Sequence, residues 1–435
     1  MNSSMTAPHP SPAPAEAFDH QDKVFAQAFA ILQQAINHQA FPAATLAVTH
    51  QGNVVALKAL GQVTPTGAPS FSRPLREGGD FDVKSATPNP GGQGAVQPST
   101  LFDLASLTKV VATATTAMLL YERGLLDLEA PISAIVPEFT TDAAKDPRRR
   151  EATLRMLLAH SSGLPAHEKF FLKARTRDEL LQAAFTTPLA ANPATRAEYS
   201  DIGFIILGIA LERLADEPLD RFCQREIFAP LAMTNTTFNP PLEIRANIPP
   251  TADERSQSKE EPCGSNTPVR QLPEAQPPQS ESQQPPRSTL RQRLIQGEVQ
   301  DENASTLGGV AAHAGLFSTA EDLAKFAHCM LNGGHPILRP ETITLFTRRE
   351  SAPAGTTRAL GWDTPSPPSQ SGKYLSPQSF GHLGYTGTSL WIDPTRQLSI
   401  TLLTNRTWPD SSNQAIKQIR PKFHDAIIKA LEKKR

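Results

Sequence analysis

The chain has 435 residues, 42 of them basic and 43 acidic, and its formal net charge is −1. This balance argues against a nucleic acid or an anionic membrane as the main partner, because both attract an excess of positive charge. Hydrophobic residues make up 39% of the chain, which is enough to build the core of an enzyme. The length allows two to three domains, or one large domain with insertions.

Cysteines and the first residues of the chain bear on its compartment. The 3 cysteines, Cys223, Cys263 and Cys329, are widely spaced, which favours neither a disulfide framework nor a zinc site. Residues 1–17 lack the basic and apolar regions of a secretory signal, and no run of apolar residues is long enough for a transmembrane helix. We therefore expect no membrane span. The expected location is cytoplasmic for the chain as written, or periplasmic if the true start lies upstream.

The 40 prolines are roughly twice the usual share, and they concentrate in two segments. From Pro8 to Pro14 every second residue is proline, which predicts a disordered tail over residues 1–20. Residues 249–288 are rich in proline, glutamine and serine and contain no aromatic residue, so they bury too little surface to offset the entropy of folding. We expect a disordered insertion there, within a single catalytic domain that spans residues 21–435.

The rest of the chain alternates between helical and strand-like patterns. Helices are expected where apolar residues recur every three to four positions, and strands where short apolar or β-branched runs end at turn residues. Segment 104–123 is apolar on almost every side, which indicates a buried central helix. In chain order we predict a helix at 21–38, strands at 43–49 and 53–60, helices at 104–123, 177–185, 203–214 and 320–331, strands at 390–393 and 398–404, and a helix at 413–431.

The order of these elements indicates an α+β fold, because strands lie near both ends of the chain and helices lie between them. We expect one antiparallel sheet built from the two chain termini, with a helical region inserted between them.

The first candidate for chemistry is Ser106 with Lys109, at the start of the buried helix. Positions i and i+3 share one face of a helix, so the two side chains are neighbours. A buried lysine tends to have a lowered pKa, which would let it accept a proton from a nearby hydroxyl. The alternative is a helix-terminal serine followed by a surface lysine, since S-x-x-K occurs about once by chance in a chain of this composition. A second match, Ser256 with Lys259, lies in the proline-rich insertion.

Two further motifs follow along the chain. Tyr199-Ser200-Asp201 precedes the helix at 203–214, where Ser200 or Asp201 could simply cap that helix. Segment 381–387 reads Gly-His-Leu-Gly-Tyr-Thr-Gly and leads into a strand, and glycines beside a strand allow a ligand to approach the backbone closely. The alternative for this segment is a glycine-rich turn with an exposed histidine.

Together and in this order, the three motifs resemble the signature of the penicillin-binding-protein and serine β-lactamase superfamily. That signature is S-x-x-K, then Y-x-N or S-x-N, then a basic residue followed by Thr-Gly. The branch most similar to this chain is the class C-like group of hydrolases, which includes esterases and D,D-peptidases. Further similar stretches lie at 157–165, 228–234, 297–303 and 314–318. The resemblance implies a β-lactamase/transpeptidase-like fold of two intertwined lobes, with the site between the sheet and the helical region.

The resemblance also implies a role for individual residues. Ser106 would be the nucleophile and Lys109 its hydrogen-bonded activator. Tyr199 would shuttle protons, as a base toward Ser106 and as an acid toward the leaving group. The oxyanion hole would consist of the backbone N–H groups of Ser106 and Tyr385, the residue after Gly384.

Two departures from the family pattern concern substrate binding. Asp201 stands where asparagine is usual, and an ionised carboxylate only accepts hydrogen bonds, so Asp201 could instead bind Lys109 or cap the helix. His382-Leu383-Gly384 lacks both the lysine and the threonine of the motif. His382 takes the place of the basic residue, and a histidine that is mostly neutral at pH 7 holds an anion less firmly. We therefore expect β-lactam hydrolysis to be less favoured than ester or peptide hydrolysis.

The predicted function is a serine hydrolase that acts through an acyl-enzyme on small esters or D-amino-acid-containing peptides, with no metal and no organic cofactor. β-Lactam hydrolysis is an alternative, as is a catalytically silent relative that binds similar ligands. The expected partners are small-molecule ester, peptide or β-lactam substrates. We interpret His160, in the segment 157–165, as support for a turn rather than as a catalytic group.

Overall fold

A computed structural model describes residues 12–14, 16–63, 94–141, 145–255, 291–366 and 369–433. Most of the expected tail and insertion, the second S-x-x-K match and Cys263 lie outside these ranges. In the part of the chain that the structure describes, no helix is both long and apolar enough to cross a membrane.

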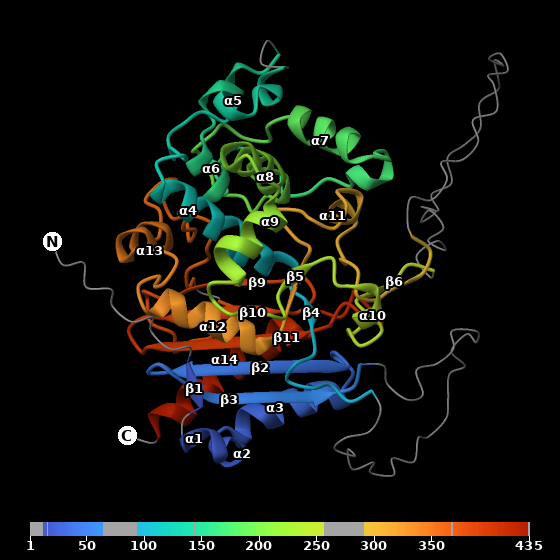
Figure 1. The fold of residues 1–435 in the computed structure, drawn as a ribbon, viewed down its shortest axis with the longest axis vertical. Coiled ribbons are helices and arrows are strands. Elements are labelled where there is room, and N and C mark those ends of the chain that lie inside the picture. Colours follow the sequence, from blue (N-terminus) through green and yellow to red (C-terminus); the bar gives the residue numbers. More distant parts are fainter. Residues whose placement is uncertain are drawn as a thin grey trace, which may run out of the picture.

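The centre of the fold is a six-stranded sheet built from the two ends of the chain, which confirms the predicted α+β arrangement (Figure 1). Its strand order is β1-β3-β2-β11-β10-β9, and all neighbouring strands are antiparallel except β1 and β3. Strand β9 forms one edge of this sheet. The strands are β1 (Ala13–Pro14), β2 (Ala43–His50), β3 (Asn53–Gly61), β9 (Phe380–Leu383), β10 (Ser389–Asp393) and β11 (Leu398–Thr404).

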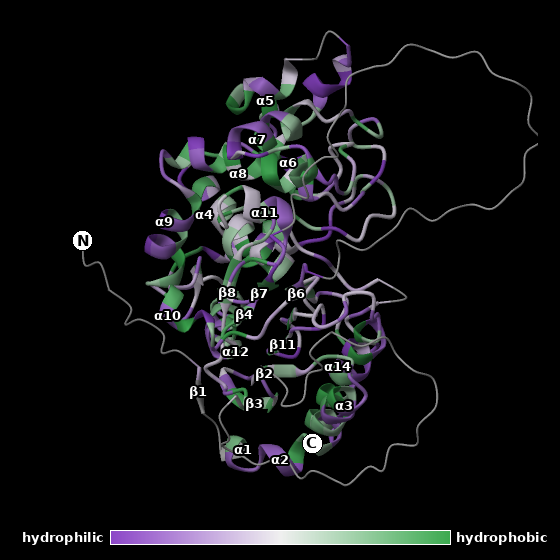
Figure 2. Cartoon of the chain, turned by 90° about the vertical axis from the view of Figure 1, so that its right-hand side faces the viewer, coloured by the Kyte–Doolittle hydropathy of each residue, from purple (hydrophilic) through white to green (hydrophobic). Residues whose placement is uncertain are grey.

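Helices cover both faces of this sheet because its central strands are apolar on both sides. Leu46 and Val48 of β2 belong to an apolar cluster with α3 and α14, which lie side by side (Figure 2). Ala43 and Ala47 of the same strand belong to a second cluster with α12, since successive side chains of a strand point to opposite faces. The helices next to the sheet are α1 (Glu16–Asp19), α2 (Gln21–Val24), α3 (Ala26–Asn37), α12 (Ala320–Leu331) and α14 (Ile416–Glu432).

The helical region is inserted between β3 and β9 and lies above the sheet in Figure 1. At its centre is α8, an apolar helix that packs against α4, α6 and α7. The elements of this region are β4 (Phe102–Asp103), α4 (Thr115–Glu122), α5 (Ile132–Ile135), α6 (Leu154–Leu158), α7 (Arg177–Thr186), α8 (Asp201–Ala215), α9 (Leu219–Cys223), β5 (Thr237–Phe238), α10 (Leu242–Arg245), β6 (Ala252–Asp253), β7 (Leu294–Ile295), α11 (Glu302–Thr306), β8 (Leu316–Ser318) and α13 (Pro340–Thr347), with short helical turns η3 (Pro137–Thr140), η4 (Pro147–Glu151), η5 (Phe170–Leu172) and η6 (Gln224–Phe228).

The predicted central helix at 104–123 is not continuous. A 3₁₀ turn, η1 (Ala105–Leu107), is followed by a wider π-helical stretch, η2 (Lys109–Ala114), and then by α4. Every residue of η2 is buried, as the all-round apolar pattern predicted. The Thr115 hydroxyl donates to the carbonyl of Val110, five residues earlier, which satisfies an acceptor in the widened stretch.

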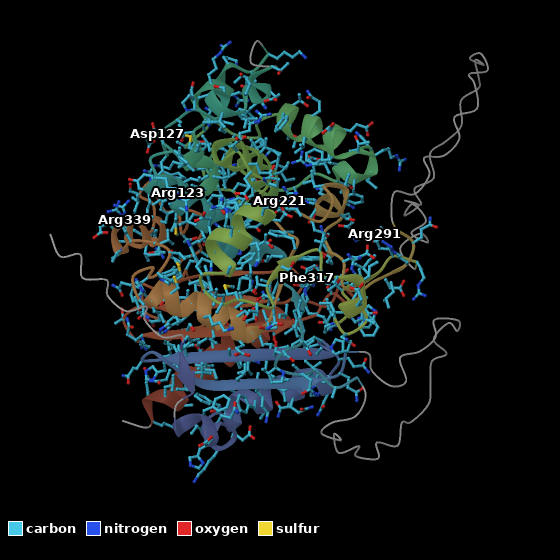
Figure 3. The ribbon with its side chains drawn as sticks, viewed as in Figure 1. Arg123, Asp127, Arg221, Arg291, Phe317 and Arg339 are labelled. Atoms are coloured by element: carbon cyan, nitrogen blue, oxygen red, sulfur yellow. The ribbon has the colours of Figure 1, made fainter. Side chains whose placement is uncertain are left out.

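Two expected boundaries were wrong. The tail predicted over residues 1–20 contains β1 and α1, and β1 pairs with β3. The insertion predicted from residue 249 onward contains β6. This strand pairs with β7, which follows residues 256–290 in the sequence. Arg291, labelled in Figure 3, forms a 2.6 Å ion pair with the buried Glu254 next to these strands. These long-range contacts fix residues whose local composition favours disorder.

Candidate active site

The S-x-x-K and Tyr-Ser-Asp motifs meet at the hydroxyl of Ser106. Tyr199 lies immediately before α8, and its hydroxyl donates a 2.7 Å hydrogen bond to Oγ of Ser106. Nζ of Lys109 donates to the same oxygen at 3.1 Å. The fold thus joins one hydroxyl to two groups that can exchange protons with it, although Tyr199 is 93 residues away in sequence.

The turn that presents Ser106 is held by a buried carboxyl group, that of Asp103. Ala105 has a φ of 46°, a left-handed conformation that is unusual for alanine. Oδ1 of Asp103 accepts the N–H of Ala105 at 2.8 Å, and Oδ2 accepts the N–H of Gln300 at 2.7 Å. Burial raises the pKa of Asp103 to about 6. Asp103 therefore stabilises a strained backbone directly before Ser106, as is common at functional sites.

Lys109 is fully buried, as we predicted from the apolar surroundings of its helix. Nζ lies 2.6 Å from Oδ1 of Asp201 and 2.9 Å from the carbonyl oxygen of His313. Burial lowers the pKa of Lys109 below its usual value of 10.5, against the opposing attraction of Asp201. Burial alone would raise the pKa of Asp201, but Lys109 and His167 outweigh it and hold that pKa well below its usual range.

The position of Asp201 decides between the alternatives left open by the sequence. Ser200 caps α8, because its Oγ accepts the N–H of Gly203 at 3.0 Å. Asp201 begins the helix, and its carboxylate binds Lys109. His167 approaches the second carboxylate oxygen, with Nδ1 3.7 Å from Oδ2.

Tyr199 is enclosed by aromatic and cationic groups. Its ring centroid lies 4.7 Å from that of His160, and Nζ of Lys109 lies 4.8 Å from the Tyr199 centroid. Nδ1 of His160 accepts the N–H of Ser200 at 3.0 Å, so His160 supports the turn that carries Tyr199, as we predicted. Burial, together with the charge of Asp201, raises the pKa of Tyr199 well above 10. The phenol is therefore protonated in the resting site.

The third motif forms β9 and the loop that follows it, directly against the segment before Ser106. The Thr386 hydroxyl donates to the carbonyl of Asp103 at 2.8 Å, and the Thr388 hydroxyl donates to the carbonyl of Leu104 at 2.9 Å. A Cβ atom on Gly384 would collide with Oγ1 of Thr388 and lie 2.5 Å from the carbonyl oxygen of Leu104. This close approach explains the glycine.

His382 lies on β9 and is buried rather than exposed. Its Nδ1–H donates to the carbonyl of Leu383 at 2.8 Å. Burial, reinforced by the positive charges of Lys109 and Arg358, lowers the pKa of His382 to about 3. The imidazole is therefore neutral at pH 7 and cannot replace the charge of a lysine.

Arg358 also lies beside these groups, although no sequence pattern had pointed to it. Its guanidinium carbon is 5.3 Å from the ring centroid of Tyr199, and it forms an ion pair with Asp363. The Arg358 charge also helps to keep the pKa of His160 below its usual value of 6.5, after the larger effect of burial. An isolated arginine in a loop belongs to no periodic pattern, so only the tertiary structure identifies it.

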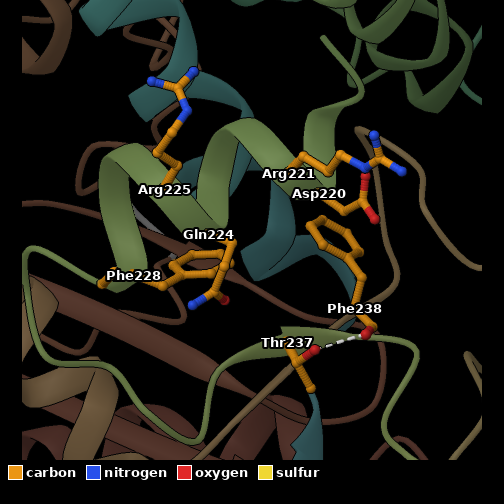
Figure 4. Close-up of a pocket in the computed structure, with 8 residues that line it drawn as sticks. Asp220, Arg221, Gln224, Arg225, Phe228, Thr237 and Phe238 are labelled. Carbon is orange, nitrogen blue, oxygen red and sulfur yellow. Dashed lines mark hydrogen bonds between the residues drawn. The ribbon is translucent and has the colours of Figure 1, made fainter.

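Other candidate sites lie elsewhere or are absent from the described residues. A cavity of about 430 Å³ is lined by α9, η6 and β5, with Arg221 and Phe238 on its walls (Figure 4). None of its residues belongs to the three motifs. Among the residues that the structure describes, no group of three or more His, Cys, Asp or Glu side chains could hold a metal ion. Cys223 and Cys329 are free and buried.

Comparison with known proteins relates this site to one family. A family model described as Beta-lactamase matches residues 25–421. The N-acetylmuramyl-L-alanine amidase of Bacillus subtilis (strain 168) is 31% identical over 385 residues, which cover 84% of this chain and 77% of the amidase. A putative D-alanyl-D-alanine carboxypeptidase of Escherichia coli (strain K12) is 32% identical over 324 residues, which cover 71% of this chain and 69% of that protein.

Solved structures share the fold at low sequence identity. EstCE1, a hydrolase with promiscuous acyltransferase activity, has a TM-score of 0.65 at 19% identity, covering 93% of this chain and 99% of EstCE1. A class C β-lactamase from Rhodobacter sphaeroides has a TM-score of 0.60 at 20% identity, covering 94% of this chain and 99% of that chain. These structures show a β-lactamase/transpeptidase-like fold. With a family model that spans most of its length, the chain belongs to the β-lactamase family and is a serine hydrolase of that family.

Proposed function

We propose that Ser106 is the nucleophile of this hydrolase and that it forms an acyl-enzyme with D-amino-acid-containing peptides or small esters. The observation that carries this proposal is the pair of hydrogen bonds at Oγ of Ser106, 3.1 Å from Nζ of Lys109 and 2.7 Å from Oη of Tyr199. A nucleophilic hydroxyl needs an acceptor for its proton, and the departing group needs a donor. Both are in place around one oxygen.

The pKa shifts favour a division of roles between these two groups. A lowered pKa makes neutral Lys109 accessible as the base, whereas a raised pKa keeps Tyr199 protonated. We therefore assign the acceptance of the Ser106 proton to Lys109. Tyr199 then serves as the acid toward the leaving group, rather than as the base toward Ser106 that the motif alone suggested.

The backbone N–H groups of Ser106 and Tyr385 are the proposed oxyanion hole. Within the described part of the chain, neither N–H takes part in a hydrogen bond, so both are free to donate. In the proposed reaction, Oγ of Ser106 attacks the substrate carbonyl carbon, and the carbonyl oxygen gains negative charge that these donors stabilise. The bond to the leaving amine or alcohol then breaks as Tyr199 protonates it. Water then attacks the remaining ester and gives one proton to the Tyr199 phenolate, while Lys109 returns its proton to Oγ of Ser106. The acid is released, and Ser106, Lys109 and Tyr199 regain their starting forms.

The neutral His382 bears on the choice of substrate class. A carboxylate next to β9 would meet an uncharged imidazole rather than a lysine, which weakens recognition of β-lactams and of peptides with a free C-terminal carboxylate but not of small neutral esters. The names of two relatives, an N-acetylmuramyl-L-alanine amidase and a putative D-alanyl-D-alanine carboxypeptidase, both denote cleavage of an amide bond, and the second names a D-amino acid. On the strength of the second name we place peptides with D-amino acids first, and because of the neutral His382 we place small esters ahead of β-lactams.

The test begins with covalent labelling of Ser106. Wild-type protein incubated with a fluorophosphonate probe should gain the mass of one adduct, on the peptide that contains Ser106, and Ser106→Ala should gain none. Turnover is then compared on a D-alanyl-D-alanine tripeptide, a p-nitrophenyl ester and a chromogenic cephalosporin. Failure of the probe to label wild type, together with no turnover of any substrate, would reject the enzyme in favour of a silent ligand-binding relative. Fastest turnover of the cephalosporin would reject the proposed substrate class only.

A further inference from the structure

A buried arginine on α14, Arg420, binds the loop that follows β9. Its side chain is 4% exposed. Nη2 donates to the carbonyl of Gly384 at 2.7 Å and to the carbonyl of Thr388 at 2.8 Å, and Nε donates to the carbonyl of Gly387 at 3.3 Å. One guanidinium thus accounts for three carbonyl groups of a five-residue loop.

Arg420 differs from an arginine in a buried ion pair in the kind of groups that bind it. Among the described residues, no carboxylate pairs with it, and its remaining hydrogen bond runs from Nη1 to Oε1 of Gln370 at 3.0 Å. Burial lowers the pKa of Arg420 to about 9. A buried cation that is satisfied by carbonyl groups alone is unfavourable unless it orders the backbone that supplies them.

The geometry of the peptide unit connects this arginine to the proposed oxyanion hole. The C=O of Gly384 and the N–H of Tyr385 belong to the same trans peptide, so they point in opposite directions. Because the Gly384 carbonyl points at Arg420 on α14, the Tyr385 N–H points away from α14. That direction is toward the face of the sheet on which the segment before Ser106 packs, since Leu104 and Leu107 belong to the cluster opposite α14.

We propose that Arg420 is a positioning residue that fixes the Tyr385 N–H in the direction of the oxyanion. This inference rests on the proposed function, because it assumes that the Tyr385 N–H is an oxyanion donor. Without the guanidinium, the Gly384 carbonyl keeps only the N–H of Gly387, at 3.1 Å, and loses its shorter bond, so the 384–385 peptide is held less firmly. Arg406 holds only the next peptide, through a 2.7 Å bond from its Nε to the carbonyl of Tyr385.

A second buried arginine provides a matched control. Arg149 is 2% exposed and donates to the carbonyls of Phe139 and Thr187, both at 2.6 Å, in the helical region. Its surroundings resemble those of Arg420 in burial and in the kind of acceptor. None of the contacts that the structure describes for Arg149 involves the three motifs, so its loss should affect folding stability alone.

The experiment compares Arg420→Met, Arg420→Lys and Arg149→Met with wild type in the full chain. Three quantities are measured: kcat and KM on the best substrate from the labelling panel, the Kd of a boronic acid transition-state analogue, and the melting temperature. Loss of one oxyanion donor typically lowers kcat by about 10²–10³-fold. We expect a fall of that order in Arg420→Met with KM changed by less than about threefold, and an equal weakening of boronic acid binding. Arg420→Lys should retain part of the kcat and part of the boronic acid affinity that Arg420→Met loses. Arg149→Met should lower only the melting temperature.

The outcomes separate this inference from the proposed function. If wild type is not labelled at Ser106, the proposed function fails and this inference fails with it. If wild type is labelled and active, but Arg420→Met keeps the wild-type kcat and boronic acid Kd, the positioning role is overturned and the nucleophile stands. If Arg420→Met does not fold, Gln370→Leu replaces it, because Gln370 is only half-buried and holds the same guanidinium. In Gln370→Leu, kcat and boronic acid affinity should fall together, by less than the fall expected for Arg420→Met. Such a fall supports the proposal, and no change in either quantity overturns it.

Discussion

Asp201 binds Lys109 through a 2.6 Å ion pair, in a site where Lys109 is also 3.1 Å from the hydroxyl of Ser106. The carboxylate favours the protonated form of the lysine, while burial favours the neutral form. In the proposed mechanism Lys109 must be neutral to accept the Ser106 proton. Asp201 would then set the pH at which Lys109 becomes available as the base, which would give a specific role to a residue that departs from the family motif.

Substitution of this carboxylate should move the pH dependence of the reaction. In Asp201→Asn the attraction that stabilises the Lys109 ammonium is lost, so the pKa of Lys109 falls further. Activity rises as Lys109 loses its proton, so the acidic limb of the profile of kcat/KM against pH should shift to lower pH. The shift should amount to roughly one pH unit or more, the usual effect of a neighbouring opposite charge.

The direction of this shift is the decisive result. Profiles of wild type and Asp201→Asn are recorded on the same ester substrate, with the melting temperature of each protein checked at every pH. An acidic limb that stays in place, or that moves to higher pH, contradicts the role of Lys109 as the base.

A second prediction concerns the hydroxyl of Tyr199. Tyr199→Phe keeps the ring contacts with His160 and Lys109 but removes the donor to Ser106. If Tyr199 is the acid for the leaving group, kcat on the peptide substrate should fall by about 10²–10⁴-fold. A p-nitrophenyl ester needs less help because its leaving group is a weak base, so its kcat should fall by a smaller factor. Equal losses on both substrates would assign Tyr199 a role other than protonation of the leaving group.

Much of the fold and the site could be predicted from local sequence patterns. Alternating or continuous apolar runs identified strands β2, β3, β10 and β11, and the helical period identified α3, α8 and α12. Spacing placed Ser106 and Lys109 on one helix face, and their hydrogen bond agrees with it. These features depend on neighbours in sequence, where periodicity carries the information.

The parts that could not be predicted depend on contacts between distant residues. Asp103, Arg358 and Arg420 are single polar residues. Asp103 and Arg420 become buried, and Arg358 half-buried, only when separate segments pack together. The left-handed turn at Ala105, near the start of the predicted helix, is held by a hydrogen bond to Asp103, whose carbonyl in turn binds Thr386 of the loop after β9. The histidine of the third motif was expected to be mostly neutral at pH 7, but its burial, which lowers the pKa of His382 to about 3, depends on the packing of the folded chain.

The close approach of two loops gives a third prediction. Gly384→Ala places a methyl group against Thr388 and the carbonyl of Leu104, so the loop after β9 must move away from the segment before Ser106. Such a shift would separate the two proposed oxyanion donors, and kcat should fall by at least about 10²-fold. Gly203→Ala is the matched control, because the nearest atoms to a Cβ there are 3.5 Å away. It lies within α8, so it should retain activity and gain up to about 1 kcal/mol in stability. Loss of activity in both variants, or in neither, would contradict the proposed contact.

The last prediction concerns stability and pH, and it uses His424 on α14. Its ring is fully buried, with Nδ1–H donating to the carbonyl of Ser371 and Nε2 accepting from the hydroxyl of Ser389. Burial, together with the charge of Arg420, lowers the pKa of His424 from 6.5 to about 3. Between those two values the unfolded chain binds a proton at this site that the folded chain does not. Stability contributed by this group is therefore intact above pH 6.5 and is lost as the pH falls, by about 1.4 kcal/mol per pH unit.

Replacement of His424 by glutamine removes this titration. The free energy of unfolding, measured with urea at pH 7.5 and at pH 5.5, should fall less between the two pH values in His424→Gln than in wild type. The difference between the two proteins should be about 1.4 kcal/mol, because pH 5.5 lies one unit below the pKa of a histidine in an unfolded chain. The comparison uses the change with pH and not the absolute stability, since the variant also loses two buried hydrogen bonds at every pH. Parallel pH dependence in the two proteins would show that His424 takes up its proton without unfolding, and that its buried, neutral state is not enforced by the fold.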